Sequence, residues 1–448
     1  MPSFVPQELV NRVRTNAERS GAAQAEAYLE IAHFVEVRVR QREVELVQSS
    51  VITGLGLRVF KDRRMGFLYT TDFRPPVLDE IVNRTISLAA EATPRDENKV
   101  SEEPPPTGLQ LDIDDPSVLT MRPEDLVPLA RSAEENAFAQ DPRVQSTRDV
   151  RAGVQSNETH FSSTYVPYLT YRASAAWLAV TAVATQGTQK RTGTFADRKR
   201  IFADLETPER VGRKAAGRAA AKLGAAAVPS AKVPVIFEAE AAGVLLRGLF
   251  PALSGVNVLE QRSFLAGKIG SPVASPLVTI LDDGTMRRGL GSRPFDGEGV
   301  QTVRTPVIEG GVLRHYLQTV VSARRMGVPT TGNAGRSYDS LPQVQPNNFY
   351  LDRGGTRPEK MIADVAHGLY VTDLAGFGID TVSGEFSQQV EGSWIEGGKL
   401  TKPVEGITVG GRLQEMLVGI NAVGTDLEYR SNVSAPSIRF QSLTVGGA

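Results

Sequence analysis

The sequence predicts an α+β protein, with antiparallel sheet units and flanking helices first and a glycine-rich, β-dominated domain last. Three observations carry this prediction. Apolar and charged residues alternate through residues 35–69, as in strands with one solvated face. Segments with helical periodicity flank these strands. Only 11 of the 42 glycines lie in residues 1–231 and 31 lie in residues 232–448, which favours a turn-rich, β-rich C-terminal half.

The first unit is predicted over residues 1–92. A helix is expected at 6–20, where Leu9, Val10 and Val13 share one face. An antiparallel meander follows, and a helix at 76–92 closes the unit. Residues 93–117 contain three consecutive prolines and several acids, so they predict an extended linker.

The same order then recurs in residues 118–230, with a helix at 122–140, strands across 144–204 and a helix at 208–226. This recurrence suggests an internal duplication, although two unrelated units would have the same pattern. The last domain is predicted over residues 231–448. Its helical inserts are expected near 239–253, 315–326, 357–366 and 411–420.

Composition excludes several classes of protein. The net charge is −1, which argues against a strong electrostatic surface for nucleic acid. The chain has no cysteine, so disulfides, thiolate metal ligands and a cysteine nucleophile are excluded. Neither a secretory signal nor a run of 18 apolar residues is present, so we expect a cytoplasmic protein with no membrane span.

The most informative motif is Arg-Pro-Phe-Asp-Gly-Glu-Gly at residues 293–299. Its carboxylates, Asp296 and Glu298, alternate with glycines that permit an unusual backbone path. The two acids could bind a cation or act as acid and base, and Asp283 in Asp282-Asp283-Gly284 could also bind a hard cation through oxygen ligands. We favour a structural role, because Asp-Gly is a common turn dipeptide.

Together with further blocks downstream, this motif resembles the TldD/PmbA family of metallopeptidases, also described as modulators of DNA gyrase. Each block is weak alone, but their order and spacing are specific. The downstream blocks are residues 331–334 (TGNA), 347–350 (NNFY), 383–387 (SGEFS), 391–398 (EGSWIEGG) and 403–409 (PVEGITV).

The resemblance also implies where zinc is held in TldD-type members. They carry His-Glu-x-x-x-His after a Gly-x-Leu-Leu sequence, which here is residues 243–246. The two histidine positions and the glutamate position hold Arg247, Ala252 and Gly248. TldD-type members also have a cysteine that resembles a third zinc ligand, and the matching residues here, 429–433, contain no cysteine. The chain therefore resembles the TldE (PmbA) type, without metal or catalytic residues of its own, and zinc is expected in a TldD-type partner.

Three hypotheses follow from these observations. The first is a non-catalytic subunit of a TldD/TldE heteromer that hydrolyses small or unfolded peptides, in peptide maturation and antitoxin degradation. The second is an autonomous homodimeric hydrolase built on Asp296, Glu298 or Asp283. The third is a regulatory binding protein, although direct contact with nucleic acid or membrane is not expected.

Smaller alternatives concern single residues. None of the four histidines lies three or four residues from another, so we interpret them as surface or capping residues, with His315 at a helix start. A Ser/His/Asp triad stays open, since its members meet only in space. Arg247 is either a solvated or interface arginine, which we favour, or a ligand for a peptide carboxylate. Strands near 407–409 and 438–440 either pair internally or offer a sheet edge to a peptide.

Overall fold

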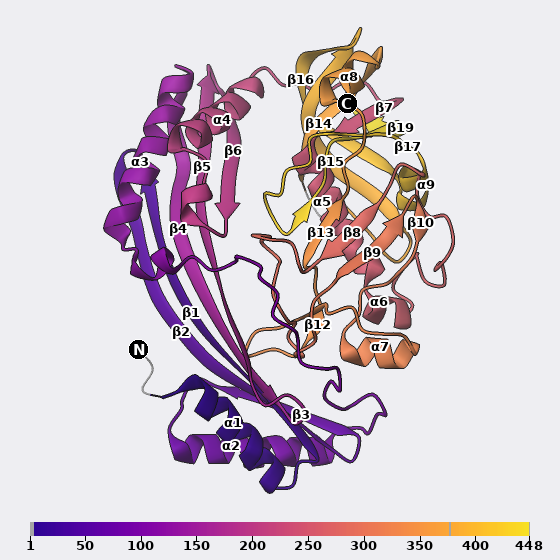
Figure 1. The fold of residues 1–448 in the computed structure, drawn as a ribbon. Helices are drawn as coiled ribbons and strands as arrows, with labels where there is room; N and C mark the ends of the chain where they lie inside the picture. The colour runs from indigo at the N-terminus through magenta and orange to yellow at the C-terminus, as the bar shows by residue number, and fades with distance from the viewer. Residues whose placement is uncertain (1–3, 376–377, 448) are drawn as a thin grey trace.

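The computed structural model describes residues 4–375 and 378–447 and confirms the α+β class. One long, curved antiparallel sheet forms the N-terminal half, and a second body of strands and short helices forms the C-terminal half (Figure 1). No helix in the described ranges is long and apolar enough to span a membrane.

The N-terminal sheet has the order β3-β2-β1-β4-β5-β6, so the segments before and after the linker share one sheet. β1 and β4 meet in its centre, and each half follows the order helix, three strands, helix. α1 and α2 pack on one end of the sheet, and α3 and α4 on the other (Figure 1). The elements are α1 Pro6–Arg19, β1 Gln24–Arg40, β2 Glu43–Lys61, β3 Arg64–Thr70, α2 Pro75–Glu91, η1 Pro116–Thr120, α3 Pro123–Gln140, β4 Val144–Ser163, β5 Leu169–Gln186, β6 Gln189–Lys199, η2 Phe202–Asp204 and α4 Pro208–Ala221.

The segment predicted as a linker contains no helix or strand over residues 93–115, and it is docked on the rest of the chain. Val100 is fully buried, and Arg324 donates hydrogen bonds to the carbonyls of Lys99 and Val100. Arg288 on the C-terminal side holds Asp112 in an ion pair of 2.7 Å. The linker therefore joins the two halves instead of spacing them apart.

The C-terminal half contains two main sheets. One has the order β10-β9-β8-β13-β18, and the other has the order β16-β15-β14-β7-β19-β17. β16 also pairs with β19, which closes five strands of the second sheet into a ring around a large apolar core. The elements are β7 Ala231–Phe237, α5 Ala239–Leu249, η3 Phe250–Leu253, α6 Gly255–Leu259, β8 Ile280–Asp283, β9 Arg304–Glu309, β10 Val312–Leu313, α7 Val320–Met326, β11 Ala334–Gly335, β12 Gln343–Val344, β13 Asn348–Leu351, α8 Pro358–Ala363, β14 His367–Ala375, β15 Glu385–Glu396, β16 Lys399–Arg412, α9 Leu413–Val418, β17 Ile420–Val423, β18 Val433–Ser434 and β19 Ile438–Gly446.

This closure decides the open question about the final strands. Residues 407–409 lie between β15 and β19, and residues 438–440 lie between β7 and β17. Their backbone groups are used inside the ring. Neither segment offers an edge to a peptide.

Two helix predictions were wrong at a boundary. α7 begins at Val320, because Thr319 and Ser322 form a capping box there, so His315 precedes the helix instead of starting it. α4 ends at Ala221, before Gly224 with its left-handed φ of +79°. The predicted helices were therefore too long, at the N-terminal end for α7 and at the C-terminal end for α4.

Candidate functional site

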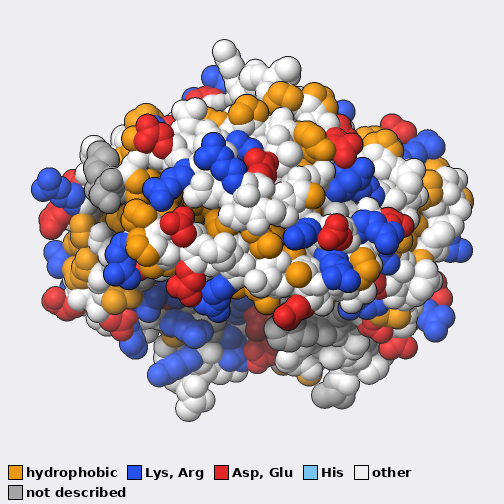
Figure 2. All heavy atoms as spheres, turned by 90° about the horizontal axis from the view of Figure 1, so that it is seen from below, with side chains coloured by type: hydrophobic (Ala, Val, Ile, Leu, Met, Phe, Trp, Pro, Cys, Tyr) orange, Lys and Arg blue, Asp and Glu red, His pale blue; other side chains and the backbone are white. Residues whose placement is uncertain are grey.

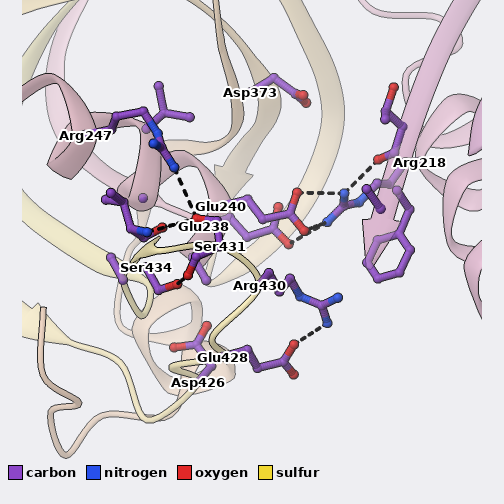
Figure 3. A pocket seen from close by; sticks show the side chains of 18 of the residues that line it. Arg218, Glu238, Glu240, Arg247, Asp373, Asp426, Glu428, Arg430, Ser431 and Ser434 are labelled. Carbon is purple, nitrogen blue, oxygen red and sulfur yellow. Dashed lines mark hydrogen bonds and ion pairs between the residues drawn. The ribbon is translucent and has the colours of Figure 1, made fainter. Parts of the chain in front are cut away.

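A cleft of about 650 Å³ lies between the upper end of the N-terminal sheet and the C-terminal half (Figure 3). This volume is within the usual range of ligand pockets, about 300–1,000 Å³. One wall comes from β6 and α4, and the opposite wall from α5, β14 and residues 426–435. On α5, positions 240, 243, 244 and 247 recur at helical spacing and face the cleft.

The cleft contains the position where the resemblance places the first zinc ligand. Arg247 lies on its wall, and its Nη2 donates to Ser431 Oγ over 3.2 Å (Figure 3). The structure thus brings residue 247 together with the segment 429–433, where the resemblance places the third ligand. A guanidinium has only N–H donors and cannot ligate a cation.

The other two zinc-motif positions are also unsuited to metal ligands. Gly248 packs against Ile379, and a Cβ on it would lie 2.2 Å from the Ile379 Cδ1 atom. Ala252 is fully buried, and its carbonyl accepts a hydrogen bond from Ser263 Oγ at 2.6 Å. In the described ranges no group of three or more His, Cys, Asp or Glu side chains could hold a metal ion. The residues present do not fit a zinc ion at these positions.

Most charges of the cleft pair across it. Arg218 of α4 forms two hydrogen bonds with Glu240 of α5, at 2.7 and 2.8 Å. Arg430 contacts Glu428 and lies 3.3 Å from Glu206. Burial raises the pKa of Glu238, and Arg218, at 4.0 Å, only partly offsets this.

Three cationic side chains of the cleft lie over the aromatic ring of Phe195. Lys214, Arg218 and Arg430 lie 4.4, 5.1 and 4.7 Å from the centre of the Phe195 ring. Cations over an aromatic face are attracted by its negative charge distribution. Phe195 therefore helps to position the basic side chains of the cleft wall.

The acids of the 293–299 motif lie elsewhere, in a second contact between the halves that we call the buried junction: Glu26, Arg58, Glu298 and Arg336. Arg58 donates to both oxygens of Glu26 at 2.9 Å and to Glu298 at 3.1 Å. Arg336 pairs with Glu26 and lies over the Tyr28 ring at 4.8 Å. The side chains of these two carboxylates and two guanidinium groups are at most 4% exposed, so their charges balance in the interior.

Asp296 is saturated by backbone donors. Its carboxylate accepts from the N–H groups of Glu298, Val300 and Ala334 at 2.9, 3.1 and 3.0 Å. Burial and the neighbouring Glu298 raise the pKa of Asp296 to about 7. Only 2% of the residue is exposed, so solvent has little access to it.

Asp282 and Asp283 also satisfy local structure. Asp282 accepts from the side-chain amides of Asn333 and Asn347 at 2.8 and 2.9 Å, and burial raises its pKa to about 6. Asp283 accepts from the N–H and the hydroxyl of Thr285 at 2.8 and 2.7 Å. The motif blocks near 282, 296, 333 and 347 thus meet in one polar network. This geometry supports a structural role for Asp283, Asp296 and Glu298.

The histidines do not join either region. His160 is buried, which corrects the expectation of surface residues, and its ring contacts Tyr168 at 2.7 Å and Glu158 at 3.0 Å. His315 contacts the Pro306 carbonyl at 2.8 Å, and His33 and His367 are exposed. Within the described ranges no histidine forms a hydrogen bond to a serine.

Family models match most of the chain. They are described as the PmbA/TldA metallopeptidase domain 1, central domain and C-terminal domain, and they match residues 25–92, 116–223 and 230–447. The chain belongs to the PmbA/TldD family.

Individual relatives agree with this assignment. Metalloprotease PmbA of Escherichia coli O157:H7 is 29% identical over 92% of this chain and 90% of its own length. A metalloprotease TldD homolog of Haemophilus influenzae is 37% identical over 52% of this chain and 49% of its own length. TldE of Thermococcus kodakarensis has the same fold, with a TM-score of 0.89 at 21% identity, and the alignment covers 98% of this chain and 100% of TldE.

Several residues of the two contacts were not found by sequence reasoning. Glu26, Arg58 and Arg336 are far apart along the chain. Glu26 and Arg58 alternate with apolar residues, as exposed strand residues do, and Arg336 lies between Gly335 and Ser337 with no strand pattern. Arg218 and Arg430 carry no motif. A weak signal existed at Gly54 and Gly56, which share a face with Arg58 and leave room for Tyr338.

Proposed function

We propose that this PmbA/TldD-family chain is a TldE-type subunit that carries no metal and completes a heteromeric peptidase with a TldD-type partner. Its substrates would be small or unfolded peptides, as in peptide maturation or antitoxin degradation, and its compartment the cytoplasm. The carrying observation is the hydrogen bond from Arg247 to Ser431, where the resemblance places two zinc ligands. The matches to PmbA, to a TldD homolog and to TldE support this assignment.

The polar geometry argues against the autonomous hydrolase. Such an enzyme would need a reacting carboxylate that reaches substrate, yet Asp296 and Glu298 are buried and occupied by neighbours. Peptide cleavage by this family in the proposed assembly would use the zinc and glutamate of the partner.

An uncovered apolar strip on β2 supports an assembly. Among the described residues, the segment 43–54 pairs with β1 alone, because β3 begins its pairing at Leu55. An open strand edge is a template for pairing with another chain. The exposed apolar residues of this strip are Val44, Leu46, Val47, Val51 and Ile52, each 38–62% exposed.

A regulatory role at DNA gyrase has less support. A structural relative from Thermotoga maritima, 26% identical with a TM-score of 0.86, is described as a modulator of DNA gyrase, and the alignment covers 99% of this chain and 100% of the relative. Basic and acidic side chains intermingle on the face that Figure 2 shows, with no broad basic patch. Direct DNA binding would need such a patch.

Peptide hydrolysis tests the proposal. The purified chain with added zinc should not cleave an unfolded peptide, whereas the chain co-expressed with a TldD-type partner should do so in a chelator-sensitive manner. A triple variant, Arg247→His, Gly248→Glu and Ala252→His, should leave the isolated chain inactive because Ile379 and the packed Ala252 site oppose the new side chains. Robust chelator-sensitive turnover by the unmodified chain alone would contradict the proposal.

A further inference from the structure

Arg247 differs from the other cations of the cleft. Arg218 pairs with Glu240, Arg430 pairs with Glu428, and Lys214 lies 3.6 Å from Glu206. Among the described residues Arg247 has no carboxylate partner, although it faces the same cleft (Figure 3). Arg247 is exposed on the cleft wall, so its guanidinium is accessible to an anion from solution.

The Arg247 side chain is also held in place. Its Nη2 donates to Ser431 Oγ, and the Ser431 hydroxyl in turn donates to the Val433 carbonyl. This chain of hydrogen bonds orients the guanidinium from one side and leaves its other N–H groups without a protein acceptor in the described structure. A planar guanidinium of this kind suits a carboxylate, which accepts two parallel hydrogen bonds.

We propose that this cleft binds short peptides by their free C-terminal carboxylate, with Arg247 as the binding residue and Ser431 as its positioning residue. This inference rests on the proposed function, since it assigns a substrate-holding role to the subunit without metal. It names the feature that the subunit recognises, which is a chain end and not a sequence.

The remaining charges of the cleft select the kind of anion. Five acids line it, namely Glu238, Glu240, Asp373, Asp426 and Glu428, against four basic residues. A multiply charged anion such as phosphate would be repelled by these acids. A peptide with one carboxylate and one ammonium group carries no net charge and fits such a mixed surface.

The walls also provide contacts for the rest of a peptide. Val244 is 47% exposed beside Arg247 on α5, and Gly243 leaves the helix surface flat between Glu240 and Arg247. Tyr370, Val433 and Ala435 add apolar surface on the C-terminal wall. Such surfaces take side chains without strict selection, as expected for a site that reads the chain end.

Calorimetric titration of the intact chain with tetra-alanine tests the inference. The free acid should bind, and the C-terminal amide should bind about tenfold or more weakly, because it loses a charge-assisted bidentate contact. Arg247→Met should weaken the free acid about tenfold or more and leave the amide unchanged. Arg247→Lys, which keeps the charge but not the fork, should fall between them.

Matched controls separate binding from folding. Arg262→Met removes an arginine that pairs with Glu260 outside the cleft, so it should bind the free acid as the unmodified chain does. Ser431→Ala should weaken the free acid less than Arg247→Met. The thermal midpoint of each variant shows that the fold is kept.

Several outcomes would overturn the inference. They are equal affinity for acid and amide, no binding of the free acid at millimolar concentration, full affinity in Arg247→Met, and equal competition by inorganic phosphate. Peptide hydrolysis by the isolated chain would contradict the proposed function but would leave the inferred carboxylate binding at Arg247 intact. Loss of the carboxylate preference, in contrast, would leave the heteromer proposal intact.

Discussion

The buried junction and the cleft both place arginines against acidic residues between the halves of the molecule, but the two contacts have different roles. In the buried junction, Arg58 and Arg336 meet Glu26 and Glu298 with almost no exposed surface. In the cleft, Arg218 and Arg430 pair with acids while these side chains stay partly exposed, and Arg247 has no carboxylate partner among the described residues. A closed set of charges fixes two bodies relative to each other, whereas an incomplete set is available for a ligand.

The largest expected effect is at Arg58. Arg58→Met would leave Glu26 with one cation and Glu298 with none of its ion pairs, both in the interior. Breaking a buried pair from one side destabilises by about 3–5 kcal/mol. Denaturant unfolding should show this loss.

The matched control is Arg213→Met on α4. Arg213 pairs with Glu209 at 2.9 Å, and both side chains are more than half exposed. Such a pair contributes about 0.5 kcal/mol or less. Equal effects of the two substitutions would show that the buried junction does not hold the halves together.

The second effect concerns the close approach that the buried junction requires. A Cβ at Gly56 would lie 2.3 Å from the backbone oxygen of Tyr338, so Gly56→Ala forces the C-terminal loop away from β2. We expect a loss of about 1–3 kcal/mol in unfolding free energy.

Gly217→Ala is its control and should have the opposite sign. Gly217 lies inside α4, and apart from the neighbouring backbone of α4 itself no atom stands within 4 Å of a Cβ built there. Replacing a helical glycine with alanine stabilises by about 0.5–1 kcal/mol. A destabilising Gly217→Ala, or a neutral Gly56→Ala, would contradict the packing described for these positions.

These positions also show what a sequence can reveal. The meander over β1 to β3 was predictable, since alternation records which face of a strand is covered. The Asp296 motif was recognisable because its glycines permit, and its proline favours, an unusual local backbone path. Arg58 was not, because its partner Glu298 lies 240 residues away and only the topology brings them together.

For a related reason, only part of the cleft could be predicted from the sequence. The resemblance places Arg247 at a histidine position of the TldD-type motif, so this position could be singled out from the sequence. Its neighbours Arg218 and Glu240 come from different halves of the chain and have no local pattern. The predicted end of α4 and the predicted start of α7 were wrong because capping geometry, and not apolar periodicity, decides where a helix begins or ends.

The third effect appears in the pH dependence of stability. Asp296 has a folded pKa of about 7 against an ordinary value of 3.8, so the folded state binds a proton that the unfolded state has lost. Its contribution is complete below about pH 4 and is lost as pH rises through 7. Asp282, with a pKa of about 6, adds the same sign over a narrower range.

Unfolding midpoints measured from pH 4.5 to 8 test this sign. Asp296→Asn removes the titrating group, so the variant should show a flatter decline than the unmodified chain, whatever its absolute stability. Glu26 has the opposite pH dependence. Arg58 and Arg336 outweigh the effect of burial and lower the pKa of Glu26 from its ordinary value. Its contribution to stability is therefore lost only in more acidic solution. An unchanged slope in the variant would mean that Asp296 is ionised in the folded protein.

The smallest effect is expected at the cleft. Arg218→Ala removes a pair with Glu240 that bridges α4 and α5, but both side chains keep contact with water. We expect a loss of about 1 kcal/mol or less, which 0.5 M salt should largely abolish by screening. The Arg58 effect should persist in the same salt, because solvent ions do not reach a buried pair. If both effects disappeared in salt, the buried junction would be as open as the cleft, and the contrast between a structural contact and a ligand site would fail.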